Sequence, residues 1–511
     1  MNVMDEAVEG FLAYKWKVMV TIAVGTWMIV LDSTVVNVAF PTLRTIFEAS
    51  VDETQWIISV YVLALGIATP LAGFLADRFG LKRVYVVGLA VFVVGSLWSG
   101  LSPTLWSLVA ARAVQGLGGG IAQPLSIAML FMAFPPREQG YAFGVFGVIM
   151  VGAPALGPIL GGLLVDHDLW RWIFFVNVPV GLLGIALALR WLRAPMEPRY
   201  ASLNLLSVAM ALAGFGGVLY AASVAGRYGW MSARVLVTLG TGIAALASFA
   251  VLELKFSRDP VLELRLFANR TFRNANLVGY VSVVALFGAE FIMPIYLQAL
   301  RGRTALESGL MLLPLAIAAA VINPIAGRLY DAIGPRLLVA TGGTVLIVNT
   351  WLLRGLSAMT TTTAILALMA MRGAAISLIM QSTYTTALGS VSHRSIPRGS
   401  SLVNSTRFIA QALSVAVLAT ILSTSLSAET RRMQDESIPS AAAGLCETDA
   451  LKRDPADRTP TTQACDEYLR GISRTYTATF VAALAALGVG LSLPGWPGEW
   501  HGREALNRGV L

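Results

Sequence analysis

Long apolar runs separated by short polar segments dominate this sequence. Fourteen runs have about the 20 residues that a helix needs to cross the hydrocarbon core of a bilayer. They form six spans, then two, then six: 17–39, 55–77, 84–102, 105–131, 141–164 and 172–192; 204–225 and 235–254; 275–298, 309–330, 336–356, 362–388, 402–425 and 476–494. The pattern predicts an all-α integral membrane protein with 14 transmembrane helices.

Domain limits follow from the same runs. We predict a cytoplasmic tail at 1–16, an N-terminal six-helix bundle at 17–192 and two inserted helices at 203–254. A C-terminal six-helix bundle at 275–494 would include an external loop at 427–475, and a second cytoplasmic tail would occupy 495–511.

Composition agrees with a membrane protein. Of 511 residues, 56% are hydrophobic and only 13% are charged, whereas soluble domains have about 25% charged residues. The net charge of +8 could indicate nucleic-acid binding, but the basic residues lie in short loops between apolar runs. Loops between even and odd helices hold most of them, so the positive-inside rule predicts that both termini are cytoplasmic, with the bilayer rather than nucleic acid as partner.

One turn motif occurs twice. Pro70, Gly73, Asp77 and Gly80, at the end of the second span, recur as Pro324, Gly327, Asp331 and Gly334, each 254 positions later. This spacing indicates an internal duplication, with the same turn in each half. We expect Asp77 to meet the positive end of a neighbouring helix or a basic side chain and so to close the cytoplasmic face. The remaining gate candidates are Arg78, Lys82, Arg83 and Arg336, with membrane anchoring alone as the alternative role for the basic residues.

Four charged residues fall at similar depth inside the apolar spans: Asp32, Arg112, Glu290 and Arg372. A charge in mid-membrane costs roughly 2.5–3.5 kcal/mol on insertion scales, so each requires an explanation. We predict that they couple transport to protons. The alternatives are a structural Asp32 bonded by Thr34 or Asn37, a water-exposed Glu290, and arginines that pair with helix carbonyls. Arg407 is interpreted as a snorkelling arginine.

Several segments resemble one family. Gly73-x-x-x-Asp77-Arg78-x-Gly80-x-Lys82-Arg83 resembles the loop signature of the major facilitator superfamily. Segments 31–41, 112–116, 153–162 and 170–179 are similar to signatures of its fourteen-helix drug:proton antiporters, the EmrB/QacA type. The resemblance covers nearly the whole chain and is most specific in the first six helices. It departs at Ala153, where the antiporter pattern has Gly. It implies the major facilitator fold, two six-helix bundles plus two inserted helices.

The fifth span carries the antiporter pattern. Prolines bend a membrane helix, and glycines allow another helix to approach closely. The resemblance implies export rather than import, with simple small-residue packing as the alternative. The residues concerned are Pro154, Gly157, Pro158, Gly161 and Gly162.

The expected function is proton-coupled efflux of amphipathic or hydrophobic compounds, mainly cations, with no enzymatic activity. No ATP-binding motif is present, and the three His do not pair within the spans, so we expect no cofactor and no metal. Exporters of lipids, siderophores or other metabolites would share the fold, and a membrane enzyme or scaffold is the less favoured class. In a cell with two membranes, the EmrB resemblance implies a periplasmic adaptor and an outer-membrane channel.

Two cysteines, Cys446 and Cys465, both lie in the predicted external loop. That compartment permits oxidation, so we expect a disulfide, although spacing alone does not prove the pairing.

Overall fold

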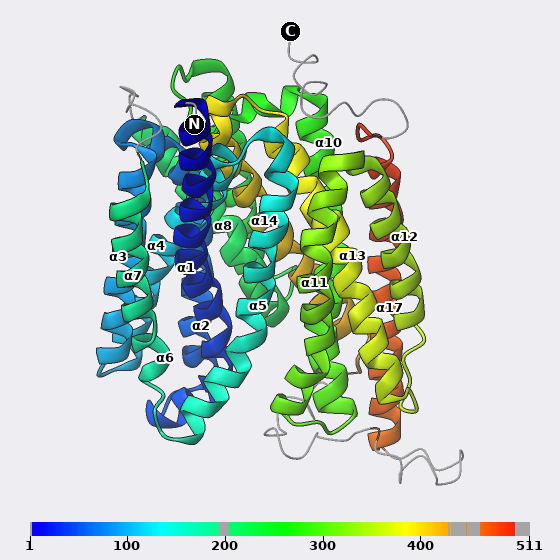
Figure 1. Cartoon of the computed structure of the whole chain (residues 1–511). Coiled ribbons are helices and arrows are strands. Elements are labelled where there is room, and N and C mark those ends of the chain that lie inside the picture. Colours follow the sequence, from blue (N-terminus) through cyan, green and yellow to red (C-terminus); the bar gives the residue numbers. More distant parts are fainter. Residues whose placement is uncertain (1–2, 194–203, 428–429, 431–445, 447–459, 496–511) are drawn as a thin grey trace.

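A computed structural model of the chain describes residues 3–193, 204–427, 430, 446 and 460–495. Within these ranges, the side chains of residues 3–13, 158, 226–227, 287–291, 305 and 460–462 lie outside the description. Long helices run up and down between two ends of the molecule (Figure 1). We call the end that holds the start of the first helix and the end of the last helix the terminal end.

The first set of helices comprises α1 (Val3–Ile46), α2 (Val51–Phe79), α3 (Leu81–Leu101), α4 (Leu105–Ala133), α5 (Gln139–Asp166), the short α6 (Trp172–Phe175) and α7 (Asn177–Trp191). The inserted pair is α8 (Leu205–Tyr228) and α9 (Ala233–Val251). The second set comprises α10 (Arg270–Ile295), the π-helix η4 (Tyr296–Leu300), α11 (Ala305–Ile333), α12 (Pro335–Leu353), α13 (Thr362–Gly389), α14 (Ile396–Thr424) and α17 (Pro460–Gly490).

Among the described residues, 13 helices are long and apolar enough to cross a membrane. The fourteenth predicted span, 275–298, coincides with α10 and η4. The predicted limits differ most from the structure at the first and last helices. Helix α1 extends from Val3 to Ile46, beyond the predicted span 17–39, and α17 begins at Pro460 inside the predicted loop.

Local sequence explains where the corresponding helices α2 and α11 begin. Ser50 and Glu53 form a capping box, in which the Ser50 hydroxyl accepts from the Glu53 amide and the Glu53 carboxylate accepts from the Ser50 amide. Thr304 and Glu307 form the same box at α11. The two caps are again 254 positions apart, so the duplication includes the start of this helix as well as its end.

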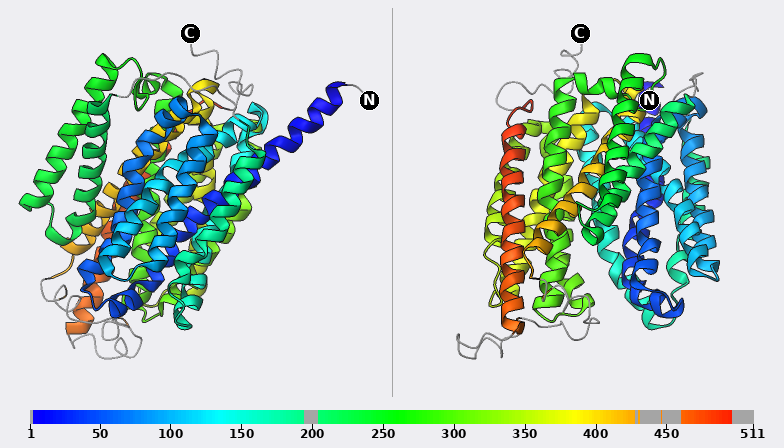
Figure 2. Two further views of the ribbon diagram at one scale, coloured as in Figure 1. Left: turned by 90° about the vertical axis from the view of Figure 1, so that its left-hand side faces the viewer. Right: turned by 180° about the vertical axis from the view of Figure 1, so that it is seen from behind.

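The two halves pack alike. In the first half α4 packs against α2 and α3, and in the second α13 packs against α11 and α12. Likewise α1 lies beside α7, and α10 lies beside α17. The halves meet through α5 with α11 and through α2 with α14. The pair α8–α9 stands at one side of the molecule, with α8 against both α2 and α14 (Figure 2).

Candidate functional site

A buried polar network surrounds Asp32 in the first half. The Asp32 carboxylate pairs with the Arg112 guanidinium, and each residue is 1% exposed. Its Oδ1 atom also accepts from Gln115 Nε2 at 2.9 Å and from Asn177 Nδ2 at 2.8 Å. Both amides donate to Ser96 Oγ, at 3.0 and 3.1 Å. The network therefore ties α1, α3, α4 and α7 together around the Asp32–Arg112 pair.

Arg112 is held by further groups. Its Nε donates to the Ile57 carbonyl of α2 at 3.2 Å, and its Nη1 donates to Gln115 Oε1 at 2.7 Å. Its guanidinium lies over the Tyr61 ring, 4.0 Å from the centroid. A buried pair is costly unless most of its hydrogen-bonding groups are satisfied. This pair meets that condition, because both side chains have several hydrogen-bond partners inside the bundle.

The expected structural partners of Asp32 do not bind it. Thr34 Oγ1 donates instead to the Leu31 carbonyl at 2.9 Å, and Asn37 is exposed. Sequence reasoning missed Ser96, Gln115 and Asn177 as members of this network. Gln115 follows Arg112 by three positions and so lies on the same helix face, which was an available signal. Asn177 stands within the quoted segment 170–179, but nothing local placed it beside Asp32.

In the second half, Arg372 of α13 is fully buried. It donates to the backbone carbonyls of Ala285 and Leu286 in α10, the latter at 2.9 Å, and to Asn349 Oδ1 at 3.1 Å. These bonds match the alternative that we gave for Arg372 from the sequence, in which the arginine pairs with backbone carbonyls of a helix. Glu290 lies about one turn further along α10, but its side chain is outside the described part of the chain.

At the terminal end, α2 reaches α14 through the turn motif. Asp77 Oδ2 accepts from Arg398 Nε at 2.5 Å, and Arg398 Nη1 also faces Glu263 Oε2 at 3.5 Å. A Cβ on Gly73 would lie 2.8 Å from both the Arg398 Cα and the Pro397 carbonyl oxygen. Gly73 thus allows the first turn of α14 to lie directly on α2, within reach of Asp77.

The second copy of the motif makes the equivalent contact. Here the motif belongs to the second half, and the helix that it contacts belongs to the first half. Asp331 of α11 accepts from the backbone amides of Gly140 at 2.9 Å and Tyr141 at 2.8 Å. Those amides belong to the first turn of α5, the positive end of that helix. A Cβ on Gly327 would overlap the Gly140 carbonyl oxygen. Each half therefore presents a glycine and an aspartate to a helix start of the other half.

Other motif residues act within their own half. Gly80 and Gly334 adopt φ of +93° and +80° at the α2–α3 and α11–α12 turns, which favours glycine. Lys82 donates to the carbonyls of Leu189 and Leu192, where α7 ends, at 2.8 and 2.7 Å. Its counterpart Arg336 donates to the Leu491 carbonyl, just beyond α17, at 2.9 Å.

These carbonyl contacts do not join the two halves, and the gate role expected of Lys82 and Arg336 stays a prediction. Each of these contacts joins the basic residue to the last long helix of its own half. The two other basic candidates lie close to the same turn. Arg78 lies over the Phe79 ring, 5.4 Å from its centroid, and Arg83 is exposed.

Small residues place α5 against α1 close to Asp32. A Cβ on Gly157 would overlap Thr34 Oγ1, and one on Gly161 would lie 2.9 Å from the Val35 carbonyl oxygen. A Cβ on Gly162 would meet no atom of another helix within 4 Å. Pro154 is half-buried in the same helix, and the Pro158 side chain lies outside the description. Gly157 and Gly161 thus set the spacing of α5 and α1, while the bend expected from the prolines stays a prediction.

Arg407 is buried, which corrects its interpretation as a snorkelling residue. It is 6% exposed, and its guanidinium lies 3.6 Å from the centroid of the Tyr384 ring. Its side chain contacts Met380, Thr383 and Tyr384 of α13 and lies beside Gly279 of α10, where an added Cβ would meet the guanidinium. A helical side chain leans towards the N-terminus of its helix, and here that direction leads into the protein.

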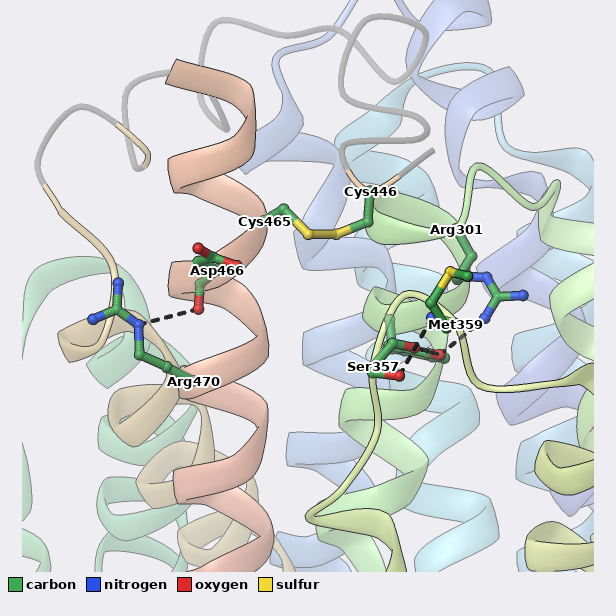
Figure 3. The surroundings of a disulfide bond; sticks show 8 residues. Arg301, Ser357, Met359, Cys446, Cys465, Asp466 and Arg470 are labelled. Atoms are coloured by element: carbon green, nitrogen blue, oxygen red, sulfur yellow. Dashed lines mark hydrogen bonds between the residues drawn. A yellow bond between two sulfur atoms is a disulfide. The ribbon is translucent and has the colours of Figure 1, made fainter. Parts of the chain in front are cut away.

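Cys446 and Cys465 form a disulfide, with their Cα atoms 5.5 Å apart (Figure 3). The Cys446 amide also donates to the Leu300 carbonyl at the end of η4, at 3.0 Å. The bond therefore fastens α17 to the η4 end of α10, opposite the terminal end.

This architecture, an all-helical bundle of two related halves with a charged network inside one of them, defines a polytopic membrane protein. The chain belongs to the Major Facilitator Superfamily, whose family model matches residues 22–415. It is therefore a transporter rather than an enzyme.

Known proteins support this assignment. The chain is 35% identical over 403 residues to the uncharacterized MFS-type transporter YhcA of Bacillus subtilis (strain 168), covering 79% of this chain and 76% of that protein. It is 30% identical over 422 residues to the multidrug resistance protein Stp of Mycobacterium tuberculosis (strain CDC 1551 / Oshkosh), covering 82% and 78%. The solved structure of the proton:xylose symporter XylE superimposes with a TM-score of 0.64 at 14% identity, covering 97% and 99%, and shows the fold alone.

Proposed function

We propose that this protein is a proton-coupled antiporter that exports amphipathic small molecules across the cell membrane by alternating access. The observation that carries the proposal is the buried Asp32–Arg112 pair and its network of amides. Similarity to Stp, which is named a multidrug resistance protein, supports export of several compounds. We place the terminal end in the cytoplasm, because the basic loops lie there.

Asp32 would exchange one proton for substrate. A neighbouring guanidinium stabilises a carboxylate, and a dry surrounding favours its protonated form. If α4 moves Arg112 away from α1 during transport, Asp32 would take up a proton. When the pair closes again, the proton would leave. Asn177 of α7 would hold the carboxylate in both states, whereas Gln115 lies on α4 and would leave together with Arg112.

The terminal contacts would form the cytoplasmic gate. Asp77 with Arg398, and Asp331 with the start of α5, hold the two halves together at that end. This arrangement supports an outward-facing state. Opening it would require both contacts to separate, which gives the inward-facing state in which substrate enters.

A proton gradient supplies sufficient energy for this cycle. One proton moving through 100–200 mV provides roughly 2.3–4.6 kcal/mol, which corresponds to about a 50- to 2,000-fold substrate gradient. A single titrating carboxylate therefore suffices. In a cell with two membranes, we also propose a periplasmic adaptor and an outer-membrane channel as partners.

Two measurements test the proposal. The first is growth inhibition of an efflux-deficient host by dyes, uncouplers, detergents and antibiotics, comparing the wild type with Asp32→Asn and with the control Glu53→Gln, whose carboxylate caps α2 at the surface. The second is proton release when an identified substrate is added to purified protein in weakly buffered detergent solution. Coupled antiport would be rejected if Asp32→Asn still confers resistance and if the wild type releases no protons when substrate is added.

A further inference from the structure

Arg407 of α14 is a buried cation without an anionic partner among the described residues. Its Nη2 donates to Thr383 Oγ1 at 3.1 Å, and its Nη1 approaches the Met380 sulfur at 3.8 Å. Its Nε atom has no hydrogen-bond acceptor within the described part of the chain. The guanidinium also lies against the face of the Tyr384 ring. These neutral groups leave its positive charge uncompensated.

The other arginines buried inside the two bundles have stronger acceptors. Arg112 pairs with the Asp32 carboxylate, and Arg372 donates to two backbone carbonyls and an amide oxygen. A buried charge usually has such partners because its desolvation costs several kcal/mol. Arg407 differs from both residues, and an anion supplied from outside the chain would complete its surroundings.

The surroundings of Arg407 are built to hold the guanidinium. Gly279 of α10 leaves space for it, since a Cβ there would lie 2.7 Å from Arg407 Nη2. The Tyr384 hydroxyl donates to Asn404 Oδ1 at 2.9 Å, which fixes the ring under the charge. Arg407 lies 11 positions after Ile396, the start of α14. At about 1.5 Å per residue this is roughly 16 Å, near the middle of a hydrocarbon core about 30 Å thick.

The same cluster reaches the other half of the protein. The Phe143 ring of α5 lies 5.2 Å from the Tyr384 ring, and Phe131 and Phe146 lie 5.7 and 6.3 Å from Phe143. A cation is thus joined to a row of aromatic rings across the interface between α5 and α13. In alternating access this interface separates, which would expose both the charge and the rings.

We propose that Arg407 binds the anionic group of a substrate, and that the Phe143–Tyr384 rings bind its aromatic or apolar body. This inference rests on the proposed transport function, because it requires the halves to separate. It adds organic anions to the cationic compounds expected from the sequence. The guanidinium would bind a carboxylate or sulfonate by charge-assisted hydrogen bonds from its Nε and Nη atoms.

Binding of a matched set of probes tests the site without any proton gradient. The probes are 1-naphthoate, the neutral 1-naphthamide and the cation 1-naphthylmethylammonium, measured by titration calorimetry on the full chain in detergent, with detergent blanks. The wild type should bind naphthoate about tenfold more tightly than naphthamide. Arg407→Gln should remove this preference and leave the naphthamide affinity within about twofold, whereas Arg407→Lys should keep most of it.

A control variant shows whether the effect is specific to Arg407 or common to any arginine that stacks on a tyrosine ring. Arg234 lies over the Tyr228 ring at 4.4 Å, where α8 is joined to α9 and away from α5 and α13, so Arg234→Gln should bind the probes like wild type. The proposal is overturned if the wild type shows no preference for naphthoate or no binding of it, or if Arg407→Gln retains the preference. A wild type that discriminates between the probes but fails to pump would reject antiport and leave the anion site standing.

Discussion

Replacing Asp77 by asparagine should open the gate that we propose at the terminal end. The Asp77 and Arg398 side chains are 13% and 8% exposed and 2.5 Å apart, so solvent screens their attraction only weakly. Hydrogen bonds between charged groups contribute about 1.5–3 kcal/mol. The asparagine side chain would retain an acceptor but lose the charge. The ratio of closed to open molecules should therefore fall by roughly 10- to 150-fold if the whole contribution is specific to the closed state.

Thiol labelling measures this change directly. Ser400 of α14 is buried and donates to the Pro124 carbonyl of α4 at 2.7 Å, so it lies between the halves. Ser126 is equally buried but bonds within its own helix, to the Ala122 carbonyl. In the Asp77→Asn background, maleimide should label Ser400→Cys faster than in the parent, while the labelling rate of Ser126→Cys should not change.

The same labelling experiment distinguishes a contact that holds the two halves together from a motif that only sets the orientation of the helices in the membrane. Arg398→Gln should give a similar increase at Ser400→Cys, and the double variant should exceed neither single variant by much, because both substitutions remove the Asp77–Arg398 contact. Arg398→Gln additionally loses the longer approach to Glu263, at 3.5 Å. Unchanged labelling of Ser400→Cys in Asp77→Asn would refute the latch and leave the motif with membrane anchoring alone.

Three further predictions concern separate parts of the chain. Gly157→Ala should slow transport and lower the melting temperature, because its Cβ would collide with Thr34, whereas Gly162→Ala, with open space, should behave like wild type; equal loss in both would contradict the packing argument. Cys446→Ser should destabilise the protein by about 3 kcal/mol, as the chain-entropy model gives for a loop of this length. The melting temperature should fall, and a reducing agent should lower the melting temperature of the wild type but not that of the variant. Glu290→Gln should weaken export of cationic compounds more than export of neutral ones, or remove the voltage dependence of cation export. If the variant exports both kinds of compound like the wild type, with an unaltered voltage response, then proton coupling belongs to Asp32 in the first half alone.

The class of fold could be predicted from the sequence for two reasons. Membrane spans are recognised by their local composition, and the duplication is recognised by the constant spacing between matching residues. The 254-residue offset also relates the Ser50 and Thr304 caps, which pattern reading could have found. The offset extends to Lys82 and Arg336, but their carbonyl partners at the ends of α7 and α17 could not be deduced, since any nearby helix end offers carbonyls.

The interior of the site was less predictable. Asp32 and Arg112 were recognised because a charge within an apolar run is conspicuous, whereas Ser96 and Asn177 are ordinary polar residues in their own helices. Only the relative rotation of α1, α3 and α7 brings them to one carboxylate. Arg407 was misread for a similar reason. Its position near the inner end of the predicted span 402–425 suggested access to solvent, but the packing of α10 and α13 buries it.

The role of Asp32 is tested most directly by uphill transport in proteoliposomes with an imposed pH gradient, once a substrate is known. The wild type should accumulate substrate against its gradient, with proton movement in the opposite direction. Asp32→Asn should only equilibrate substrate across the membrane, while its affinity for substrate stays within about tenfold of the wild type. Full gradient-driven accumulation by Asp32→Asn would contradict the account, since the buried pair with Arg112 would then be a structural element and the proton would travel elsewhere.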